Sequence, residues 1–373
     1  MKVMQILYSG LGGHGSVAFS LHNAAVAAAS DWQESMMFVG IEPVLEIYER
    51  RCQEDAIPYR PVRSREGRPW RSWAAVYRGL CVERPDVLLL HSVKLFLPCW
   101  WYAWRHGAVL IGVEHQANAL KSRSEWMVSR LLMRLAHGVV VLTREYREEL
   151  NKAMGRAFRG NKVHVVPNGI DVECFAPRDH GTEEEEPVRA LGMAARFTPG
   201  KCQKVLVEAV EKLRTFHPGM DWQLWLAGEG ETLESVKALV EERGLEKTVV
   251  FSGHLEEQDL PDWYRSLDIY VHASKGETLS TSLLQAMATG LPVVASDVPG
   301  ISNLLGGAEQ YGLLVEDNTP EAFARTLALL AGDEDLRMEL SWRARKHVVC
   351  NYSHKIMFQK YQQVISACRK SFT

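Results

Sequence analysis

The 373-residue sequence lacks the signatures of several specialised classes of protein. Its seven cysteines are scattered and include no CxxC pair, which argues against a disulfide framework and against a zinc site. No apolar run approaches the length of a membrane span, and the opening MKVMQILYSGLGG is too short for the hydrophobic region of a signal peptide. A continuous basic stripe of the kind that binds nucleic acid is also missing. We therefore expect a cytoplasmic globular protein with free thiols.

The charge that is present is unevenly distributed. Residues 1–178 hold 23 Lys and Arg against 17 Asp and Glu, whereas residues 179–373 hold 20 against 29, and the whole chain has a net charge of −3. A basic first half and an acidic second half indicate two domains with different partners.

Short apolar runs alternate with amphipathic segments along the chain. Continuous runs such as VLLL (87–90) and VVVL (139–142) are typical of parallel strands covered on both faces. The alternation stops at the acidic segment HGTEEEEPVR (180–189) and then restarts, so we predict a linker there. The pattern predicts an α/β protein of two doubly wound parallel-sheet domains facing a cleft. One large domain is the alternative, and the central position of the linker makes it the weaker one.

Glycine-rich turns follow several predicted strands. SGLGGHGS (9–16) is not a clean GxGxxG motif and no Walker lysine follows it, so a phosphate or sugar loop and an ordinary tight turn are equally good interpretations. AGEG (227–230) is a second such turn. In FSGHL (251–255) the backbone groups beside Gly253 can pair with the edge of a nucleobase.

Two cations flank a predicted strand-to-helix turn in AARFTPGK (194–201). Arg196 ends the strand and Lys201 precedes the helix. Together they can hold a diphosphate through charge-assisted hydrogen bonds. The alternative is that both are ordinary solvated side chains.

A lone carboxylate precedes a predicted helix in KGETLSTSLLQAMATG (275–290). Glu277 leads into a helix over 281–288, for which Ser280 or Thr281 is a natural N-cap. The backbone amides that open this helix form a potential anion site. Gln285, rather than a second acid, lies on the helix. We interpret the acidic triplet Asp333–Asp335 as a helix cap rather than a metal site, and predict no bound metal.

Four separated segments resemble the retaining glycosyltransferases of family 4, which have the GT-B fold of two Rossmann-like domains. The segments are RFTPGK (196–201), LAGEG (226–230), VVFSGHL (249–255) and ETLSTSLLQAMATGLPVVASDVPG (277–300). Four further stretches are similar to parts of the same family: DVLLLHS (86–92), VEHQ (113–116), VVPNGIDVECFAPR (165–178) and NYSHKIMFQKYQQVI (351–365).

The resemblance implies three parts of the chain. Residues 1–178 form an acceptor-binding domain, residues 179–350 bind a nucleotide-sugar donor, and residues 351–373 are a helix that crosses back to the first domain.

The resemblance also implies a role for individual residues. Arg196 and Lys201 match the pair of residues that binds the donor diphosphate in this family. Glu277 matches the first acid of the E-x7-E motif, which contacts the transferred sugar. Gln285 stands where the family has the second acid, which binds ribose. The remaining matches are Thr278 and Leu279 at backbone contacts with the sugar or phosphate, His115 near the reacting sugar, Gly13 facing the diphosphate, and Gly228, His254 and Leu255 in the nucleotide site.

The expected activity is transfer of a sugar, with UDP-sugars favoured, to a glycan or lipid-linked acceptor in bacterial surface polysaccharide or lipopolysaccharide synthesis. Anomeric configuration is retained, and no cofactor is needed beyond the donor substrate. Two alternatives stay open. Gln285 is compatible with a non-catalytic glycosyltransferase-like subunit, and a nucleotide-sugar epimerase has a similar architecture.

Arginine and tryptophan are concentrated in the first domain, in REGRPWRSWAAVYRG (65–79), LPCWWYAWRHG (97–107) and KSRSEWMVSRLLMRLAHG (121–138). This combination suits peripheral attachment to the anionic inner leaflet of the cytoplasmic membrane. Burial of the tryptophans between helix and sheet is an equally good interpretation of CWWYAW (99–104).

Overall fold

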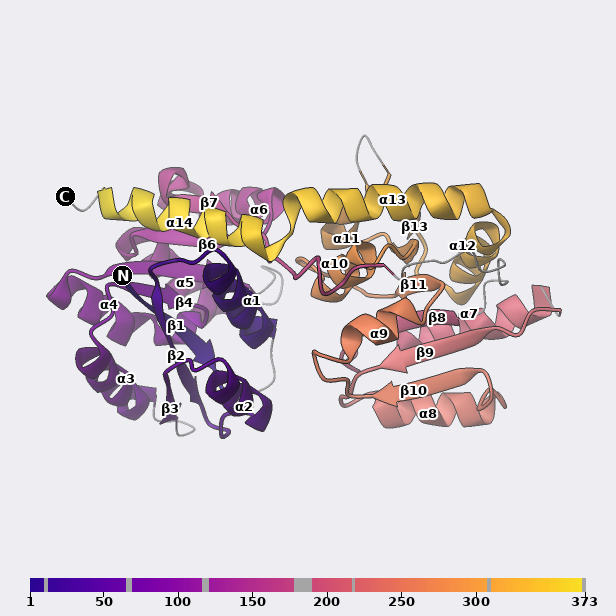
Figure 1. Ribbon diagram of the computed structural model, residues 1–373, viewed down its shortest axis with the longest axis horizontal. Helices are drawn as coiled ribbons and strands as arrows, with labels where there is room; N and C mark the ends of the chain where they lie inside the picture. The colour runs from indigo at the N-terminus through magenta and orange to yellow at the C-terminus, as the bar shows by residue number, and fades with distance from the viewer. Residues whose placement is uncertain are drawn as a thin grey trace. The chain divides into compact units, whose positions relative to one another are not determined.

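The computed structural model describes residues 1–9, 13–64, 69–115, 121–177, 190–216, 219–306 and 310–370. The chain divides into two compact units, shown in Figure 1. Unit 1 combines Met1–Gly169 with the C-terminal His354–Thr373, and unit 2 is Ile170–Ser353. The linker predicted at residues 180–189 lies outside the described residues.

Unit 1 contains a seven-stranded, all-parallel sheet in the order β3-β2-β1-β4-β5-β6-β7. Its strands are β1 (Lys2–Tyr8), β2 (Gln33–Gly40), β3 (Tyr59–Arg63), β4 (Val87–Leu90), β5 (Val109–Glu114), β6 (Gly138–Val141) and β7 (Val163–Val165). Its α-helices are α1 (Gly13–Ala27), α2 (Glu46–Glu54), α3 (Pro69–Glu83), α4 (Phe96–His106), α5 (Arg123–Leu135), α6 (Arg144–Met154) and α14 (His354–Lys370). Short 3-10 turns are η1 (Val93–Leu95), η3 (Gly155–Ala157) and η4 (Gly160–Lys162).

Both faces of this sheet are buried, as its continuous apolar strands predict. On one face α1 lies beside α14, whose Phe358 and Tyr361 pack with strand residues such as Val87. On the other face α3, α4, α5 and α6 cover strand residues such as Leu88 and Leu90. Neighbouring residues of β4 therefore point to opposite layers of core.

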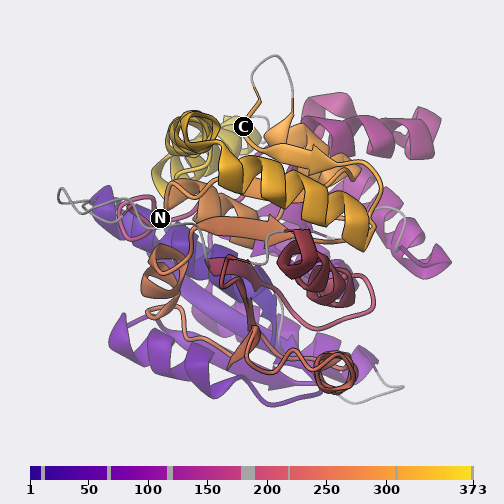
Figure 2. The ribbon, with the colours of Figure 1, turned by 90° about the vertical axis from the view of Figure 1, so that its right-hand side faces the viewer.

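Unit 2 repeats the arrangement with a six-stranded parallel sheet in the order β10-β9-β8-β11-β12-β13. Its strands are β8 (Ala190–Ala194), β9 (Gln223–Ala227), β10 (Val249–Gly253), β11 (Ile269–His272), β12 (Val293–Ser296) and β13 (Leu313–Val315). Its helices are α7 (Gln203–Phe216), α8 (Leu233–Glu242), α9 (Leu260–Arg265), α10 (Thr281–Ala288), α11 (Pro299–Leu305), α12 (Pro320–Gly332) and α13 (Glu334–Asn351). Helices α7 and α12 lie side by side (Figure 2).

The predicted doubly wound parallel sheets are confirmed in both units. Elements β3 and α2 were not predicted from the sequence. YRPVR (59–63) contains no apolar run, and its proline suits only an edge strand, which is the position that β3 occupies. No helix of the described chain combines the length and the apolarity needed to cross a membrane.

Candidate functional site

The order of the strands in unit 2 creates a switch point between β8 and β11. These neighbours pair in parallel, but the chain leaves β8 towards β9 and leaves β11 towards β12. Ligands of open parallel sheets bind where two such loops diverge. Here the loops are also tied together, because Cys202 N–H donates to Ala273 O at 3.0 Å and Lys275 N–H donates to Gly200 O at 2.9 Å.

This pairing brings together two residues that lie 76 positions apart in the sequence. Lys201 Nζ forms an ion pair with Glu277 Oε1. His272, at the end of β11, places Nε2 at 2.9 Å from the same carboxylate oxygen. Because an ionised carboxylate only accepts hydrogen bonds, this contact requires a proton on His272 Nε2. Tyr270 Oη lies 3.4 Å from the other ring nitrogen, Nδ1.

Burial controls the charge of the two basic groups in this cluster. His272 is fully buried, and desolvation, assisted by the charge of Lys201, lowers its pKa well below the usual value. Burial also lowers the pKa of Lys201 to about 8, although the Glu277 carboxylate favours the charged ammonium. The cluster therefore contains the neutral imidazole of His272, which donates a hydrogen bond to Glu277, and the ammonium of Lys201, which forms an ion pair with the same carboxylate.

Arg196 is exposed on the segment that follows β8, the same segment that carries Lys201. Gln203, at the start of α7, donates to Arg196 O at 3.1 Å and holds this loop. The loop packs against the turn after β9, where a Cβ on Gly228 would lie 2.2 Å from Ala195 O. Gly228 also has a φ of 127°, so this position requires glycine for two reasons.

The segment from Glu277 into α10 is also fixed locally. Ser280 caps α10 by accepting a hydrogen bond from Leu283 N–H, which confirms the predicted cap. A Cβ on Gly300 would lie 2.1 Å from Glu277 O, so α11 approaches the acid's backbone too closely for any side chain. Thr278 is half-buried and Leu279 is buried on the same turn.

Gln285 is buried within α10 and meets a tyrosine. Tyr264 Oη lies 3.2 Å from Gln285 Oε1 and 3.1 Å from Ser282 O. One hydroxyl proton serves only one of these acceptors at a time. The Tyr264 hydroxyl can donate to an amide oxygen at position 285, and it could donate to a carboxylate oxygen there as well.

His254 and Leu255 follow β10, the edge strand of the same sheet. They lie at the same carboxyl edge as Lys201 but two strands from β8, roughly 10 Å along the sheet. The turn after β9, which contains Gly228, lies between these two residues and the Lys201–Glu277 pair in the order of the strands.

Unit 1 presents its own polar residues at the carboxyl edge of its sheet. His115 follows β5 and is half-buried, and its Nε2 lies 2.9 Å from Nδ1 of His91, which follows β4. Next to it, Glu114 and Lys121 form a fully buried ion pair at 2.7 Å. Gly13 begins α1, whereas residues 10–12 of the predicted glycine loop lie outside the described residues.

The acidic triplet at residues 333–335 acts as a cap, as the sequence predicted. Asp333 is the N-cap of α13 and accepts from Leu336 N–H at 2.9 Å. In the part of the chain that the structure describes, no three His, Cys, Asp or Glu side chains are grouped to hold a metal ion.

Three residues of the site were missed by sequence reasoning. His272 ends an apolar strand and resembles any buried strand residue, and Tyr264 lies on α9, far from Gln285 in sequence. Gly300 lies at the end of the segment 277–300, and nothing in its local sequence indicates a contact with Glu277. A buried histidine five residues before an acid, at the end of a strand, is the one signal that the sequence offered.

Solved structures share the fold of this chain. The crystal structure of Anabaena HepE in complex with UDP and glucose superposes with a TM-score of 0.80 at 17% sequence identity and covers 98% of this chain and 99% of that chain. A glycosyltransferase from Rickettsia africae gives a TM-score of 0.80 at 16% identity, with 98% of each chain covered. The fold is thus the GT-B fold of glycosyltransferases, as expected.

Two family models match successive parts of the sequence. Residues 12–174 match "Glycosyltransferase Family 4" and residues 177–347 match "Glycosyl transferases group 1". The chain belongs to the family 4 glycosyltransferases.

Similar proteins include a D-inositol 3-phosphate glycosyltransferase of Jonesia denitrificans, 32% identical over 200 residues that make up 50% of this chain and 47% of that protein. The lipopolysaccharide core biosynthesis mannosyltransferase LpsB of Rhizobium meliloti is 32% identical over 181 residues, 45% of this chain and 50% of that protein. The matched part of the chain thus spans about half the length of these relatives.

Burial of neutral His272 predicts a specific pH dependence of stability. Since its pKa is lowered in the folded state, the unfolded chain binds the additional proton, and the free energy of unfolding falls as pH decreases below about 6.5. His272→Gln, which keeps a donor near Glu277, should remove up to about 1.4 kcal/mol per pH unit of this slope. Urea denaturation between pH 7.5 and 5.5 measures the difference.

The matched control is His254→Gln, which removes an exposed imidazole from the same unit and should keep the wild-type slope. Equal slopes for the wild type and His272→Gln would show that the pKa of His272 is the same in the folded and the unfolded chain, and would contradict the neutral buried imidazole.

Proposed function

We propose that this protein transfers a sugar from a nucleotide-diphosphate sugar, with a UDP-sugar as first choice, to a glycan or lipid-linked acceptor. The proposed setting is bacterial surface polysaccharide or lipopolysaccharide synthesis. The observation that carries the proposal is the Lys201–Glu277 pair at the switch point of unit 2. Family membership supports it, as do the solved structure of HepE with UDP and glucose and the name of LpsB.

In the proposed reaction the bond between the anomeric carbon and the diphosphate breaks as the acceptor oxygen attacks from the same face. The acceptor proton passes to the departing phosphate oxygen, so configuration is retained without a metal ion. Arg196, Lys201 and the amides at the start of α10 stabilise the negative charge that grows on the diphosphate. Glu277, held by His272, orients the sugar through its hydroxyl groups.

Thr278 and Leu279 are proposed to offer backbone amides to the sugar or phosphate, because they lie between Glu277 and the first turn of α10. Gly228, His254 and Leu255 are proposed to line the nucleotide part of the site. His115 of unit 1, with Gly13 at the start of α1, is proposed to contact substrate.

A donor-turnover assay tests the transferase function. Nucleotide release and product formation are measured with a panel of nucleotide sugars, with and without a lipid extract as acceptor. Glu277→Ala and Lys201→Ala should each lower kcat/KM by about a hundredfold or more, because each removes a preorganised charge. Lys204→Ala, an exposed lysine at the start of α7, is the matched control and should keep wild-type turnover.

Wild-type turnover in both the Glu277 and the Lys201 variants would refute the assignment. An epimerised sugar that forms without any acceptor would identify an epimerase, and the absence of turnover with every donor would identify a non-catalytic subunit.

Gln285 gives a second measurement at the same site. Because a carboxylate binds ribose hydroxyls more strongly than an amide does, Gln285→Glu should lower the KM for the donor by about fivefold. Gln285→Met keeps the size of the side chain, removes its polar atoms, and should raise this KM. If Gln285→Glu raises the KM as much as Gln285→Met, ribose does not bind at this position.

We further propose that one surface of unit 1 contacts an anionic membrane. On α4 the apolar residues Leu97, Trp101 and Trp104 are 41%, 49% and 63% exposed. Their spacing of i, i+4 and i+7 places them on one face of the helix. On α5 a single stripe at positions i, i+4, i+7 and i+11 is exposed and carries Arg123, Met127, Arg130 and Arg134. Both helices cover the same face of the sheet, so aromatic and cationic groups share one outer surface.

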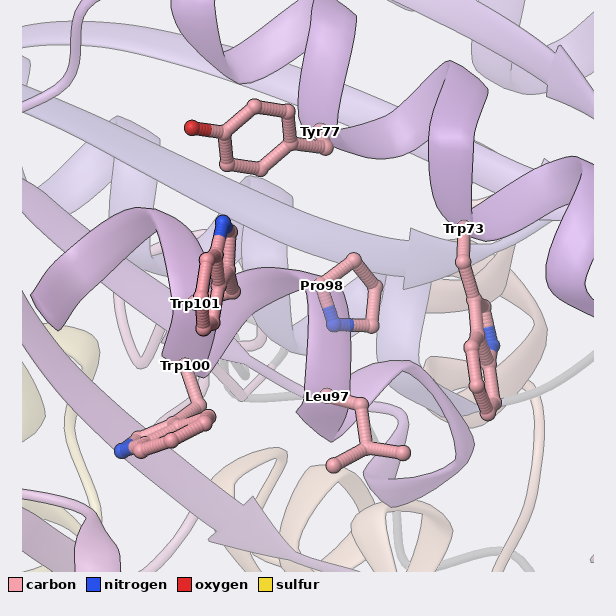
Figure 3. Close-up of a pocket in the computed structure, with 6 residues that line it drawn as sticks. All are labelled: Trp73, Tyr77, Leu97, Pro98, Trp100 and Trp101. Carbon is pink, nitrogen blue, oxygen red and sulfur yellow. The ribbon is translucent and has the colours of Figure 1, made fainter. Parts of the chain in front are cut away.

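A hollow of about 280 Å³ lies between α3 and α4 on this surface. Figure 3 shows Trp73 and Tyr77 from α3 and Leu97, Pro98, Trp100 and Trp101 from α4 around it. Its apolar lining suits part of a lipid chain. The alternative, burial of the tryptophans of CWWYAW between helix and sheet, is wrong for Trp101 and Trp104, which are exposed, although Cys99 and Tyr102 of the same segment are buried.

Sedimentation with vesicles tests this contact. The protein should sediment at low salt with vesicles that contain phosphatidylglycerol and not with pure phosphatidylcholine vesicles. The double variant Trp101→Ser with Trp104→Ser should bind at least about tenfold more weakly. Trp342→Ser removes an equally exposed tryptophan, 63%, from unit 2 and serves as the control. Failure of the wild type to bind at low salt would refute membrane contact.

A further inference from the structure

A line of hydrogen bonds runs beneath the carboxyl edge of the unit 1 sheet and ends at His115. Nε2 of His115 lies 2.9 Å from Nδ1 of His91, and the two rings stack with centroids 5.2 Å apart. Nε2 of His91 lies 3.0 Å from Oε1 of Gln5, in the middle of β1. Gln5 and His91 are 0% and 2% exposed, so these bonds form away from solvent.

The Gln5 amide fixes the direction of this line. Its Nε2 donates to Ala18 O at 3.1 Å and to Glu34 Oε1 at 2.5 Å, and the second carboxylate oxygen of Glu34 meets Nδ1 of His22 at 2.9 Å. A backbone carbonyl only accepts hydrogen bonds, so the nitrogen of the amide must face Ala18. The oxygen of the amide consequently faces His91.

An amide oxygen requires a donor, so His91 carries its proton on Nε2. Charging a ring that is 2% exposed is costly, and a neutral His91 then has a bare lone pair on Nδ1. That lone pair faces Nε2 of His115 at 2.9 Å, which must therefore carry a proton. In the neutral His115 ring the other nitrogen, Nδ1, has no proton and can only accept.

We infer that Gln5 and His91 are positioning residues that hold His115 in its Nε2–H tautomer, so that Nδ1 accepts a hydrogen bond from a hydroxyl of the bound saccharide. The ligand part of this inference rests on the proposed function. The tautomer is a property of the chain itself and is measured without substrate. Neither Gln5 nor His91 needs to touch substrate, because each acts through the next residue.

Nitrogen-15 NMR of histidine-labelled protein reads the tautomer directly, because protonated and bare ring nitrogens have distinct chemical shifts. His115→Asn and His91→Asn assign the two signals. In the wild type both rings should be Nε2–H tautomers. Gln5→Leu removes the acceptor for His91, and His91→Leu removes the acceptor for His115, so each should convert the His115 signal to a mixture of tautomers.

The rescue variant is His91→Asn, whose amide oxygen replaces the Nδ1 acceptor and should keep His115 in the Nε2–H form. In the turnover assay Gln5→Leu and His91→Leu should lower kcat/KM by about tenfold, with His91→Asn closer to the wild type. Circular dichroism and thermal unfolding establish whether each variant is folded. If a variant does not fold, the NMR spectrum of the wild type by itself still determines the tautomer of His115.

An Nδ1–H tautomer of His115, a doubly protonated His91, or an unchanged His115 signal in both folded leucine variants would overturn the inference. The expected tautomers in a protein that turns over no nucleotide sugar would leave the positioning intact and refute the proposed function alone.

Discussion

The site of unit 2 depends on the hydrogen bonds that tie the loop after β8 to the loop after β11. Adjacent parallel strands bring the two loops to one edge, but without the bonds between Cys202 and Ala273 and between Lys275 and Gly200 they would diverge. These bonds hold the two loops together so that Lys201 and Glu277 form an ion pair. Gly228 and Gly300 allow neighbouring turns to approach this arrangement more closely than any side chain would permit.

Each unit uses a buried histidine after the switch point of its sheet. His91 follows β4 and His272 ends β11, and these are the fourth strands of their units in chain order. Each ring is held through one nitrogen by the strands beneath and presents the other towards a residue at the sheet edge, His115 in unit 1 and Glu277 in unit 2. A neutral imidazole suits this position because it is donor and acceptor at once and adds no buried charge.

Much of the architecture was predictable from the sequence, because buried parallel strands are continuous apolar runs. The strands at VLLL (87–90) and VVVL (139–142) followed from such runs, and the Ser280 and Asp333 caps followed from polar residues placed before a predicted helix. The edge strand β3 did not, since it is only partly covered and has no apolar run. Lys201 and Glu277 were recognised as one site through the family resemblance, and the structure brings them into contact.

The contacts of His272 with Glu277, of Tyr264 with Gln285 and of Gln5 with His91 could not be predicted in the same way. Each joins side chains whose meeting depends on strand register or on the course of a loop, and neither is encoded in local periodicity. These contacts set protonation states and hydrogen-bond directions. The chemistry of the site is therefore less visible in the sequence than its position.

The most direct test of the account is a crystal structure of the protein with a bound nucleotide-diphosphate sugar. The account predicts a diphosphate within hydrogen-bond distance of Lys201 Nζ and the Arg196 guanidinium, with a sugar hydroxyl on the Glu277 carboxylate. A nucleotide sugar bound elsewhere, with the Lys201–Glu277 pair unchanged, would contradict it.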